Sequence, residues 1–429
     1  MIERYSVTEI TKIWNEESRF KKMLDVEMAL LETWELKKVI PSGTAAAFKN
    51  VKINPTRISE IELETRHDVI AFCTSITEQV KPELARYFHF GVTSSDILDT
   101  ALSLQLKESI EIIMKDLKGL IEALDLQIQN TKDLLCLGRS HGMAAEPMIF
   151  AQKFLSFQAE FKRRLRDYEH ILNSELTGQI SGAVGNYTVM TPEVESLTLK
   201  KLGLPIEAVS TQVIPRDHLA LMVSIGALTA TAMERLAVEL RLLHHSDISE
   251  IHEGFKKGQK GSSTMPHKKN PISSENITGL ARVIRSHLDI ALENIVLWHE
   301  RDISHSSTER LYLPDHLGLL SYSLRRCNST ILDLEIHREH IEGKVKEKFT
   351  CLSSLILHEL IAQNATSRDV LYAIVQEASF QAKSYEEMIS ILKSKLAEKN
   401  LQGDFQKLDW NSIKTLYIGR FNDVLARNK

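Results

Sequence analysis

Apolar residues recur at three- and four-residue spacing through most of the chain, which predicts amphipathic helices. Residues 18–37 form the first clear example. From residue 96 to about 335 the pattern runs over longer stretches, predicted as helices at residues 97–131, 147–176, 217–250, 273–300 and 314–335. At 1.5 Å per residue these helices would be roughly 30 to 50 Å long, which suits an elongated helical bundle.

Shorter helical patterns lie on both sides of this central region. Before residue 93 they alternate with breakers such as Pro41-Ser-Gly43 and Asn54-Pro55, and they return after residue 340. A chain of 429 residues is long enough for two or three domains. We therefore predict an all-α fold with three helical domains at residues 1–92, 93–340 and 341–429, the central one a long-helix bundle.

The run Leu219-Ala-Leu-Met-Val-Ser-Ile-Gly-Ala-Leu228 is apolar on more of its surface than a lone bundle needs. A helix of this kind requires a further partner to cover it. We expect the bundle to pack against copies of itself in an oligomer.

Composition limits the possible partners and the compartment. The formal charge is -4, with Lys and Arg spread among more numerous acids, so nucleic acid is not an expected partner. The four cysteines lack the close spacing of a zinc or redox site. Because the first residues form no apolar signal and no stretch approaches roughly 20 apolar residues, we predict a cytoplasmic protein that does not bind or cross a membrane.

The most informative stretch runs from residue 260 to residue 271. It follows several glycines and lysines, a composition that favours a mobile cationic loop able to close over an anion. An ordinary surface turn is the alternative for its Gly-Ser-Ser start. However, the rigid Met265-Pro266 step leads directly to Lys268 and Asn270, so the Ser262 hydroxyl, an ammonium and an amide come together at one end of the loop.

Two further polar blocks precede apolar helical runs. Arg66-His67-Asp68 is either a surface charge cluster or a site in which the carboxylate fixes the histidine tautomer and raises its pKa. Thr93-Ser-Ser-Asp96 predicts an N-cap for the helix expected from residue 97. A helix N-terminus also offers free amide donors to a carboxylate or phosphate, so capping and anion binding are compatible.

Three blocks lie between or at the ends of the long helices. His141 lies in a Gly-flanked segment, residues 138–147, predicted as a loop with Pro147 at the start of the next helix. Gln212 lies in a polar turn and offers both amide donors and an acceptor. In the segment 298–310, Arg301, Ser306 and Arg310 offer guanidinium and hydroxyl donors suited to binding phosphate. The alternative is that they belong to a helix end with surface salt bridges.

A metal site near His244-His245 and His252 is not predicted. Adjacent residues cannot face the same way on a helix, and the nearby Asp247 and Glu250 complete no recognisable ligand spacing. We therefore predict no metal site at these histidines.

The run Gly261-Ser-Ser-Thr-Met-Pro-His-Lys-Lys-Asn-Pro271 resembles the signature loop of the fumarase/aspartase superfamily, whose members release fumarate from succinyl-bearing substrates. With the blocks above in the same order, essentially the whole chain is similar to the bacterial adenylosuccinate lyases of that superfamily. Ser140, Ala144 and Met148-Ile149 depart from the usual pattern near His141. The resemblance implies a homotetramer whose shared active sites draw residues from three subunits. It also implies that the chemistry needs no metal and no organic cofactor.

The resemblance also implies roles for individual residues. It makes Ser262 the general base, His141 the general acid and Glu275 the partner of the catalytic histidine, with Lys268 stabilising the dianion formed by proton removal. Such positioned groups typically contribute about 10²- to 10⁴-fold each. The substrate-binding residues it implies are Arg4, Tyr5, Arg66, His67, Asp68, His89, Thr93, Ser94, Gln212, Asn270, Arg301, Ser306 and Arg310.

The implied substrates are adenylosuccinate and the succinyl-carboxamide imidazole ribotide of purine biosynthesis, both of which release fumarate. Argininosuccinate lyase and carboxymuconate cycloisomerase are alternatives within the superfamily, but Arg4-Tyr5 and the segment 298–310 argue against both. A catalytically silent scaffold protein is the alternative from another class. The presence of Ser262, His141 and Lys268 argues against it.

Overall fold

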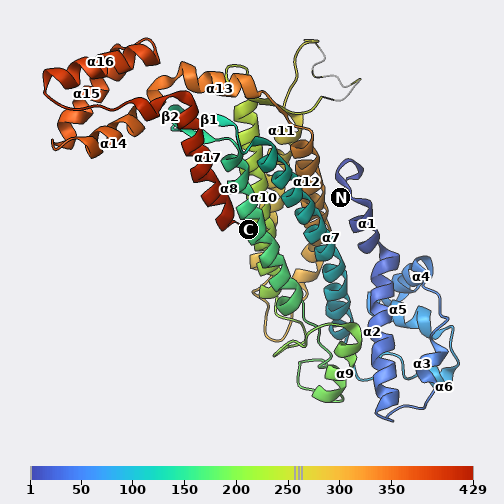
Figure 1. Cartoon of the computed structure of the whole chain (residues 1–429). Helices are drawn as coiled ribbons and strands as arrows, with labels where there is room; N and C mark the ends of the chain where they lie inside the picture. Colours follow the sequence, from blue (N-terminus) through green and yellow to red (C-terminus); the bar gives the residue numbers. More distant parts are fainter. Residues whose placement is uncertain (1, 256–257, 259–260, 262–263, 429) are drawn as a thin grey trace. The chain divides into compact units, whose positions relative to one another are not determined.

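The computed structural model describes residues 2–255, 258, 261 and 264–428 of the chain (Figure 1). Most of these residues are helical, which confirms the all-α prediction. The α-helices are α1 Thr8–Ile13, α2 Glu16–Leu36, α3 Thr44–Ala47, α4 Pro55–Thr65, α5 Asp68–Thr77, α6 Pro82–Ala85, α7 Ser94–Thr131, α8 Ala151–His170, α9 Pro192–Leu202, α10 Asp217–His244, α11 Ile272–Glu293, α12 Ser304–Leu332, α13 Arg338–Glu347, α14 Ser353–Gln363, α15 Arg368–Gln381, α16 Tyr385–Glu398 and α17 Trp410–Arg427. The strands are β1 Leu135–Ser140, β2 Met143–Ile149, β3 Ile251–His252 and β4 Glu335–Ile336.

The chain divides into two compact units, each assembled from three separate segments. The first unit comprises Met1–Gly119, Lys162–Arg235 and Asn276–Cys327, and the second comprises Leu120–Phe161, Leu236–Glu275 and Asn328–Lys429. The N-terminal region up to residue 92 belongs wholly to the first unit, and the region from residue 341 to the second. The division into three consecutive domains stays a prediction.

Aromatic packing forms the core of the N-terminal part of the first unit. The rings of Phe20 and Phe72 stack with centroids 5.9 Å apart, and Phe72 also contacts Phe88 at 6.0 Å. These rings join α2 to α5, and Figure 1 shows α4 and α5 beside α2. α2 begins where the Asn15 side chain accepts a hydrogen bond from the backbone N–H of Ser18 at 2.7 Å.

The Asn54-Pro55 step, predicted to be a breaker, starts a helix. Asn54 is the N-cap of α4, and its side-chain oxygen accepts from the N–H of Arg57. Pro55 takes the first helical position, where a missing N–H leaves no hydrogen bond unmade. The step therefore ends one element and begins the next.

The predicted long helices are present, with shifted ends. α7 spans the prediction of 97–131 with three more residues at its start, whereas α10 ends at His244 rather than at residue 250. α12 begins ten residues before the predicted start at Pro314, because Asp302 caps it by accepting from the N–H of Ser304 at 2.8 Å. Pro314 lies inside the helix, where it has no N–H to offer the carbonyl of Arg310.

The segment predicted as a loop at residues 138–147 is instead most of a β-hairpin. β1 and β2 pair antiparallel, and the two turn residues, His141 and Gly142, have φ of 53° and 76°. Two consecutive left-handed residues form a tight turn that matches the twist of the strands, and glycine favours it. Pro147 lies opposite Leu137 in the ladder, so the following helix, α8, begins only at Ala151.

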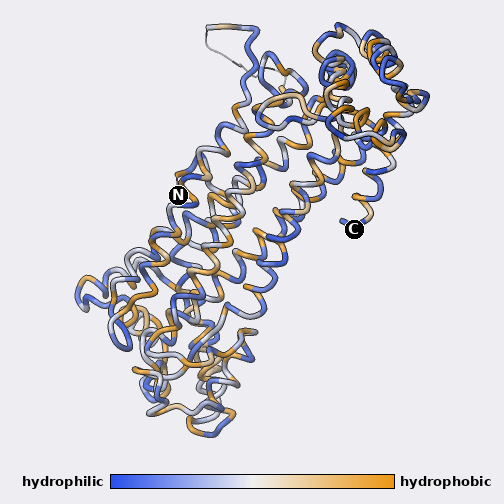
Figure 2. The backbone as a smooth tube through the Cα atoms, turned by 90° about the vertical axis from the view of Figure 1, so that its left-hand side faces the viewer, coloured by the Kyte–Doolittle hydropathy of each residue, from blue (hydrophilic) through white to orange (hydrophobic). Residues whose placement is uncertain are grey.

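Helices cover this hairpin within the second unit. α13 packs on β1 and α17 on β2, while α14, α15 and α16 pack in succession (Figure 1). Figure 2 shows apolar and polar residues alternating along the long helices, the pattern from which they were predicted. Among the described helices, α10 alone is long and apolar enough to cross a membrane, a test that a core helix also passes, and 61% of its apolar window is buried.

Candidate active site

The first unit contains a cavity of about 340 Å³ that collects residues from the N-terminal helices and from α7 and α12. Three of the predicted substrate-binding residues, Arg301, Ser306 and Arg310, lie in its wall. Polar side chains provide most of the remaining chemistry of the wall. They are Glu16, Arg19, Ser95, Asp99, Gln105, Arg216, His305 and Glu309.

Asp68 holds two arginines of the cavity in place. One oxygen of its carboxylate accepts from Arg19 at 2.8 Å and from Arg310 at 2.7 Å. Burial would raise the pKa of Asp68, but the hydrogen bonds and charges of the two arginines outweigh burial and lower it. The carboxylate is therefore ionised at neutral pH and orients both guanidinium groups.

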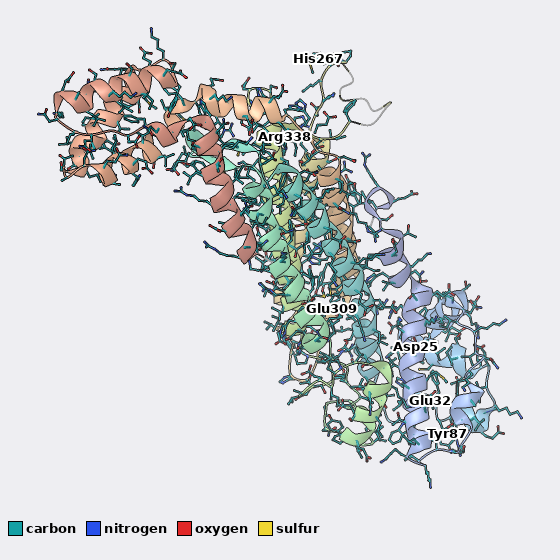
Figure 3. The ribbon with its side chains drawn as sticks, viewed as in Figure 1. Asp25, Glu32, Tyr87, His267, Glu309 and Arg338 are labelled. Atoms are coloured by element: carbon teal, nitrogen blue, oxygen red, sulfur yellow. The ribbon has the colours of Figure 1, made fainter. Side chains whose placement is uncertain are left out.

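A buried ion network lies at the inner wall. Arg216 donates to Asp99 at 2.7 and 2.9 Å and to Glu309 at 2.9 Å, and only 4% of Arg216 is exposed (Figure 3 labels Glu309 on α12). Burial raises the pKa of Glu309 against the opposing effect of Arg216. A buried charge of this kind persists only when it is paired, so Arg216 is a fixed structural cation rather than one free to bind a ligand.

Arg301 is oriented by Gln212. Its Nη1 donates to the Gln212 side-chain oxygen at 3.0 Å, while the Gln212 amide nitrogen donates to the carbonyl of Ala183 at 2.8 Å. Sequence reasoning placed the Gln212 amide against a substrate, whereas here both of its ends contact protein. Among the described residues the buried Nε of Arg301 has no hydrogen-bond partner, so this arginine keeps an unused donor.

His305 adds a neutral group to the wall. It is 3% exposed, and its Nδ1 has no partner among the residues that the structure describes. Burial, with the positive charges of Arg216 and Arg301, lowers the pKa of His305 to about 4. At neutral pH it is an uncharged imidazole that can exchange hydrogen bonds without adding charge.

His89 is fixed by a glutamate that no sequence motif marks. The fully buried carboxylate of Glu27 on α2 accepts from the backbone N–H of His89 at 3.2 Å and contacts its Nδ1 at 2.6 Å. Burial would lower the pKa of His89, but Glu27 outweighs it and the pKa is raised. The backbone of His89 is left-handed, with φ of 61°, and the same glutamate stabilises that conformation.

α7 begins at Ser94, three residues before the predicted start, and Thr93 directly precedes it. The Asp96 carboxylate accepts from the N–H of Thr93 at 2.8 Å, which caps the start of the helix, and from the N–H of Ser181 at 2.9 Å. Burial raises the pKa of Asp96 to about 6 against these hydrogen bonds. The capping interpretation therefore applies to Asp96, and both Thr93 and Ser94 stay partly exposed.

The other predicted substrate-binding residues of the first unit do not line this cavity. Arg4 and Tyr5 belong to a short 3-10 helix, Glu3–Tyr5, and the ring of Tyr5 packs against Tyr322 at 5.2 Å. Arg66 is exposed and left-handed at the end of α4. His67 caps α5 through the N–H of Ile70, and its Nδ1 is 3.8 Å from Asp68. Asp68 makes its described side-chain to side-chain hydrogen bonds to the two arginines, so its pairing with His67 stays a prediction.

In the second unit, His141 occupies the tip of the β1–β2 hairpin. The two-residue turn leaves its side chain exposed. A residue at such a tip is held by the backbone ladder on both sides while its ring stays open to solvent.

The loop that carries Lys268 closes on itself. A side chain at Gly261 would collide with the carbonyl oxygen of Lys268, so glycine is required by this close approach. The Asn270 side chain donates to the carbonyl of Gly261 at 2.9 Å. The predicted base Ser262 lies outside the described residues, and Lys268 itself is exposed.

Glu253, which precedes this loop in the chain, binds the N-terminus of α11, which follows the loop. Its carboxylate accepts from the N–H of Ser273 at 3.0 Å and from the N–H and hydroxyl of Ser274 at 2.8 and 2.6 Å. Negative charge at a helix N-terminus is stabilising. Glu275, predicted to partner the catalytic histidine, is exposed in the first turn of α11.

Sequence reasoning missed several residues that build the site. Arg19 lies on the polar side of an ordinary amphipathic helix, and Glu27 lies on the same helix with no polar neighbour pattern to mark it. Their partners, Asp68 and His89, are distant in sequence. Arg19 and Glu27 are therefore identified only by their contacts in the folded structure.

An all-α fold of long helices with an arginine-lined cavity defines a class of helical proteins whose cavity suits an anionic ligand. A model of the lyase family matches residues 3–286, and the chain belongs to that family.

Individual relatives within and beyond this family are also similar to the chain. An adenylosuccinate lyase of Synechocystis sp. is 43% identical over 383 residues, which is 89% of each chain. The adenylosuccinate lyase of Staphylococcus saprophyticus is 40% identical over the same share of both chains. Among solved structures, the 3-carboxy-cis,cis-muconate lactonizing enzyme from Pseudomonas putida has a TM-score of 0.84 at 22% identity, covering 99% of this chain and 96% of that one. At that identity it shows the shared fold.

Proposed function

We infer that this chain is a carbon–nitrogen lyase that eliminates fumarate from adenylosuccinate, leaving AMP. The observation that carries this inference is 40–43% identity to adenylosuccinate lyases along 89% of the chain. We further propose that it releases fumarate from the succinyl-carboxamide imidazole ribotide of purine biosynthesis, whose succinyl group carries the same scissile bond.

The cavity of the first unit supports a phosphate site for the nucleotide. Arg310 is held by Asp68, and Arg301 is held by Gln212 with one donor unused. Ser306 adds a hydroxyl to the same wall. Forked guanidinium donors beside a hydroxyl are the groups that bind phosphate most strongly in proteins.

The chemistry requires removal of a carbon-bound proton next to a carboxylate, which produces a dianion. We propose that Ser262 takes this proton, that Lys268 and Asn270 stabilise the dianion and that His141 protonates the departing nitrogen. Serine is too weak an acid to ionise unaided at neutral pH, so nearby cations and loop amides must lower its pKa. Glu275 is proposed as the partner of the catalytic histidine.

Proton NMR of the purified protein with adenylosuccinate tests the reaction directly. We expect fumarate and AMP to appear, a Ser262→Ala variant to lose this activity, and argininosuccinate to remain intact. Fumarate from argininosuccinate alone would preserve the reaction class but contradict the nucleotide site. No fumarate from any of the substrates would favour the alternative of a catalytically inactive scaffold protein.

A matched pair of serine variants tests the phosphate site. Ser306 lines the cavity, whereas the neighbouring Ser307 is exposed with its hydroxyl near the carbonyl of Ser304. We expect Ser306→Ala to raise the KM for adenylosuccinate about tenfold, by loss of one hydrogen bond to a charged group, and Ser307→Ala to leave it unchanged. Equal KM values in both variants would remove Ser306 from the binding site.

We also propose a cytoplasmic homotetramer with shared active sites. Its support is the exposed apolar surface of α10 and α11, where Leu221, Leu228, Val283 and Leu292 are each 41–49% exposed. Size-exclusion chromatography with light scattering should give four times the chain mass of 48.7 kDa. A monomer that retains full activity would contradict shared sites.

A further inference from the structure

A two-stranded ribbon in the second unit brings together three side chains able to bind a metal. β3 and β4 pair antiparallel, with His252 directly opposite Glu335. His337 lies two residues beyond Glu335, a spacing that places both on the same face of an extended chain. One ligand atom from each of the three residues lies within 4.8 Å of the other two.

The hydrogen bonds of His337 leave it a lone pair for a metal. Its Nδ1 lies 2.9 Å from the carbonyl oxygen of Ser249, which can only accept, so Nδ1 carries the proton. Nε2 then has the free lone pair. A histidine that donates its other nitrogen to a backbone carbonyl is the arrangement that orients metal-binding imidazoles.

A neighbouring histidine, His244, is excluded as a ligand by the same reasoning. Its Nδ1 accepts from the N–H of Glu253 at 3.2 Å, and its Nε2 donates to the carbonyl of Lys269 at 3.1 Å. Both nitrogens are therefore in use. The His244 ring forms a wall, 4.7 Å from the ring of His252, while the ring of His337 lies 4.5 Å from His252 on another side.

Charge and exposure also suit a cation. The ring of His252 keeps a nitrogen for a metal, since its one described hydrogen bond is a 3.4 Å contact between Nε2 and the Ser249 hydroxyl. Glu335 supplies a negative charge and is exposed, while His252 and His337 are half-buried. The site therefore has both the ligands and an open route from solvent.

We propose that His252, Glu335 and His337 bind a divalent transition metal of the zinc type, with water at the fourth position. Two imidazoles and one carboxylate form a ligand set that zinc takes in proteins when one position stays open. The sequence did not predict this site because Asp247 and Glu250 are the acids near His252 in the chain. The carboxylate that lies opposite it comes from β4 instead.

One strand of the proposed metal site, β3, lies directly before the loop that carries Lys268 in the chain. His252 precedes Glu253, whose carboxylate holds the N-terminal residues of α11 at the far end of the loop. A metal that joins β3 to β4 therefore fixes the strand from which that loop starts. The inference does not depend on the identity of the substrate.

Titration of metal-free protein without an affinity tag tests the proposal. Cobalt(II) is the probe, followed by its visible absorption, and zinc is then added as a competitor. We expect one equivalent of cobalt to bind and zinc to displace it. His252→Ala, His337→Ala and the conservative Glu335→Gln should each weaken binding more than about tenfold, because each removes one of three ligands.

His245→Ala is the matched control. His245 is an exposed histidine beside His244, and its Nδ1 accepts from the N–H of Asp247. The control should bind like the unaltered protein, and zinc should raise the thermal unfolding midpoint of both but not of the three ligand variants. Absence of one-equivalent binding, or equal affinity in the ligand variants and the control, would overturn the site. Thermal midpoints measured without metal show that each variant is folded.

Discussion

The cavity of the first unit and the loop and hairpin of the second unit hold their charged groups in opposite ways. In the cavity, Arg19, Arg216 and Arg310 are each fixed by a carboxylate. In the second unit, His141 and Lys268 are exposed, one on a hairpin tip and one on a loop. Of these three arginines, Arg310 is proposed to bind substrate and is therefore already oriented, whereas the groups proposed to react must gain their neighbours when substrate binds.

Removal of the proposed acid should have the largest effect. We expect His141→Ala to lower kcat about 10²- to 10⁴-fold with little change in KM, because the group acts on the departing nitrogen and not on the phosphate. The rate of fumarate release measures this. His340→Ala is the control, since His340 is exposed and contacts only the carbonyl of Ile248 among its described hydrogen bonds. Equal kcat for the two variants would contradict the role of His141.

The buried network should dominate stability. Arg216→Met leaves Asp99 and Glu309 as buried carboxylates without their cation, which we expect to lower the free energy of unfolding by about 3–5 kcal/mol. Arg57→Met is the comparison, because Arg57 also pairs with two carboxylates, but all three side chains are at least 43% exposed, so we expect a much smaller loss. Urea unfolding of both variants gives the difference. Similar losses would mean that burial does not control the contribution of these pairs.

The fold was more predictable than the site, for physical reasons. Helical periodicity is local, so it located α7 and α10 to within a few residues at most ends. The β1–β2 hairpin was missed because its turn depends on the left-handed conformation of His141, which few non-glycine residues adopt. Likewise, the Asn54-Pro55 step reads as a break, although it caps a helix.

Site residues were predictable where a sequence motif marks them. They were not predictable where two residues far apart in the sequence meet only in the folded chain. The segment 298–310 supplied Arg301, Ser306 and Arg310, which do share one cavity. The buried partner of His89, Glu27, is separated from it by most of the N-terminal region. No periodicity reports that contact, since a glutamate on a helix normally faces solvent.

That glutamate gives the next effect in size. In Glu27→Gln, His89 loses the negative charge that raises its pKa, so its imidazole should be neutral over more of the pH range. We expect the KM for adenylosuccinate to rise about tenfold at pH 7 and less at pH 5, because the lower pH favours protonated His89 in both proteins. Glu32→Gln is the control on the same helix, because Glu32 is exposed and pairs with Lys201 (Figure 3). A KM increase that is the same at both pH values would indicate lost packing instead of lost charge.

The smallest effect should be a pH-dependent contribution to stability from His218. Hydrogen bonding to Glu207, followed by that to Glu175, raises the pKa of His218 to about 9 in the folded protein, against an opposing effect of burial. Because the folded pKa lies above the ordinary value, the stabilisation is complete below about pH 6.5 and is lost as the pH rises through about 9. Its full size would be about 3 kcal/mol, reduced to about 1–2 kcal/mol because the ring is partly open to solvent. His218→Gln should therefore lower the urea midpoint at pH 6 and lose that difference near pH 10, whereas His358→Gln, an exposed histidine that contacts the Ser354 carbonyl, should show no such trend. A deficit in His218→Gln that persists unchanged at pH 10 would mean that the histidine stabilises the unit by packing and not by its charge.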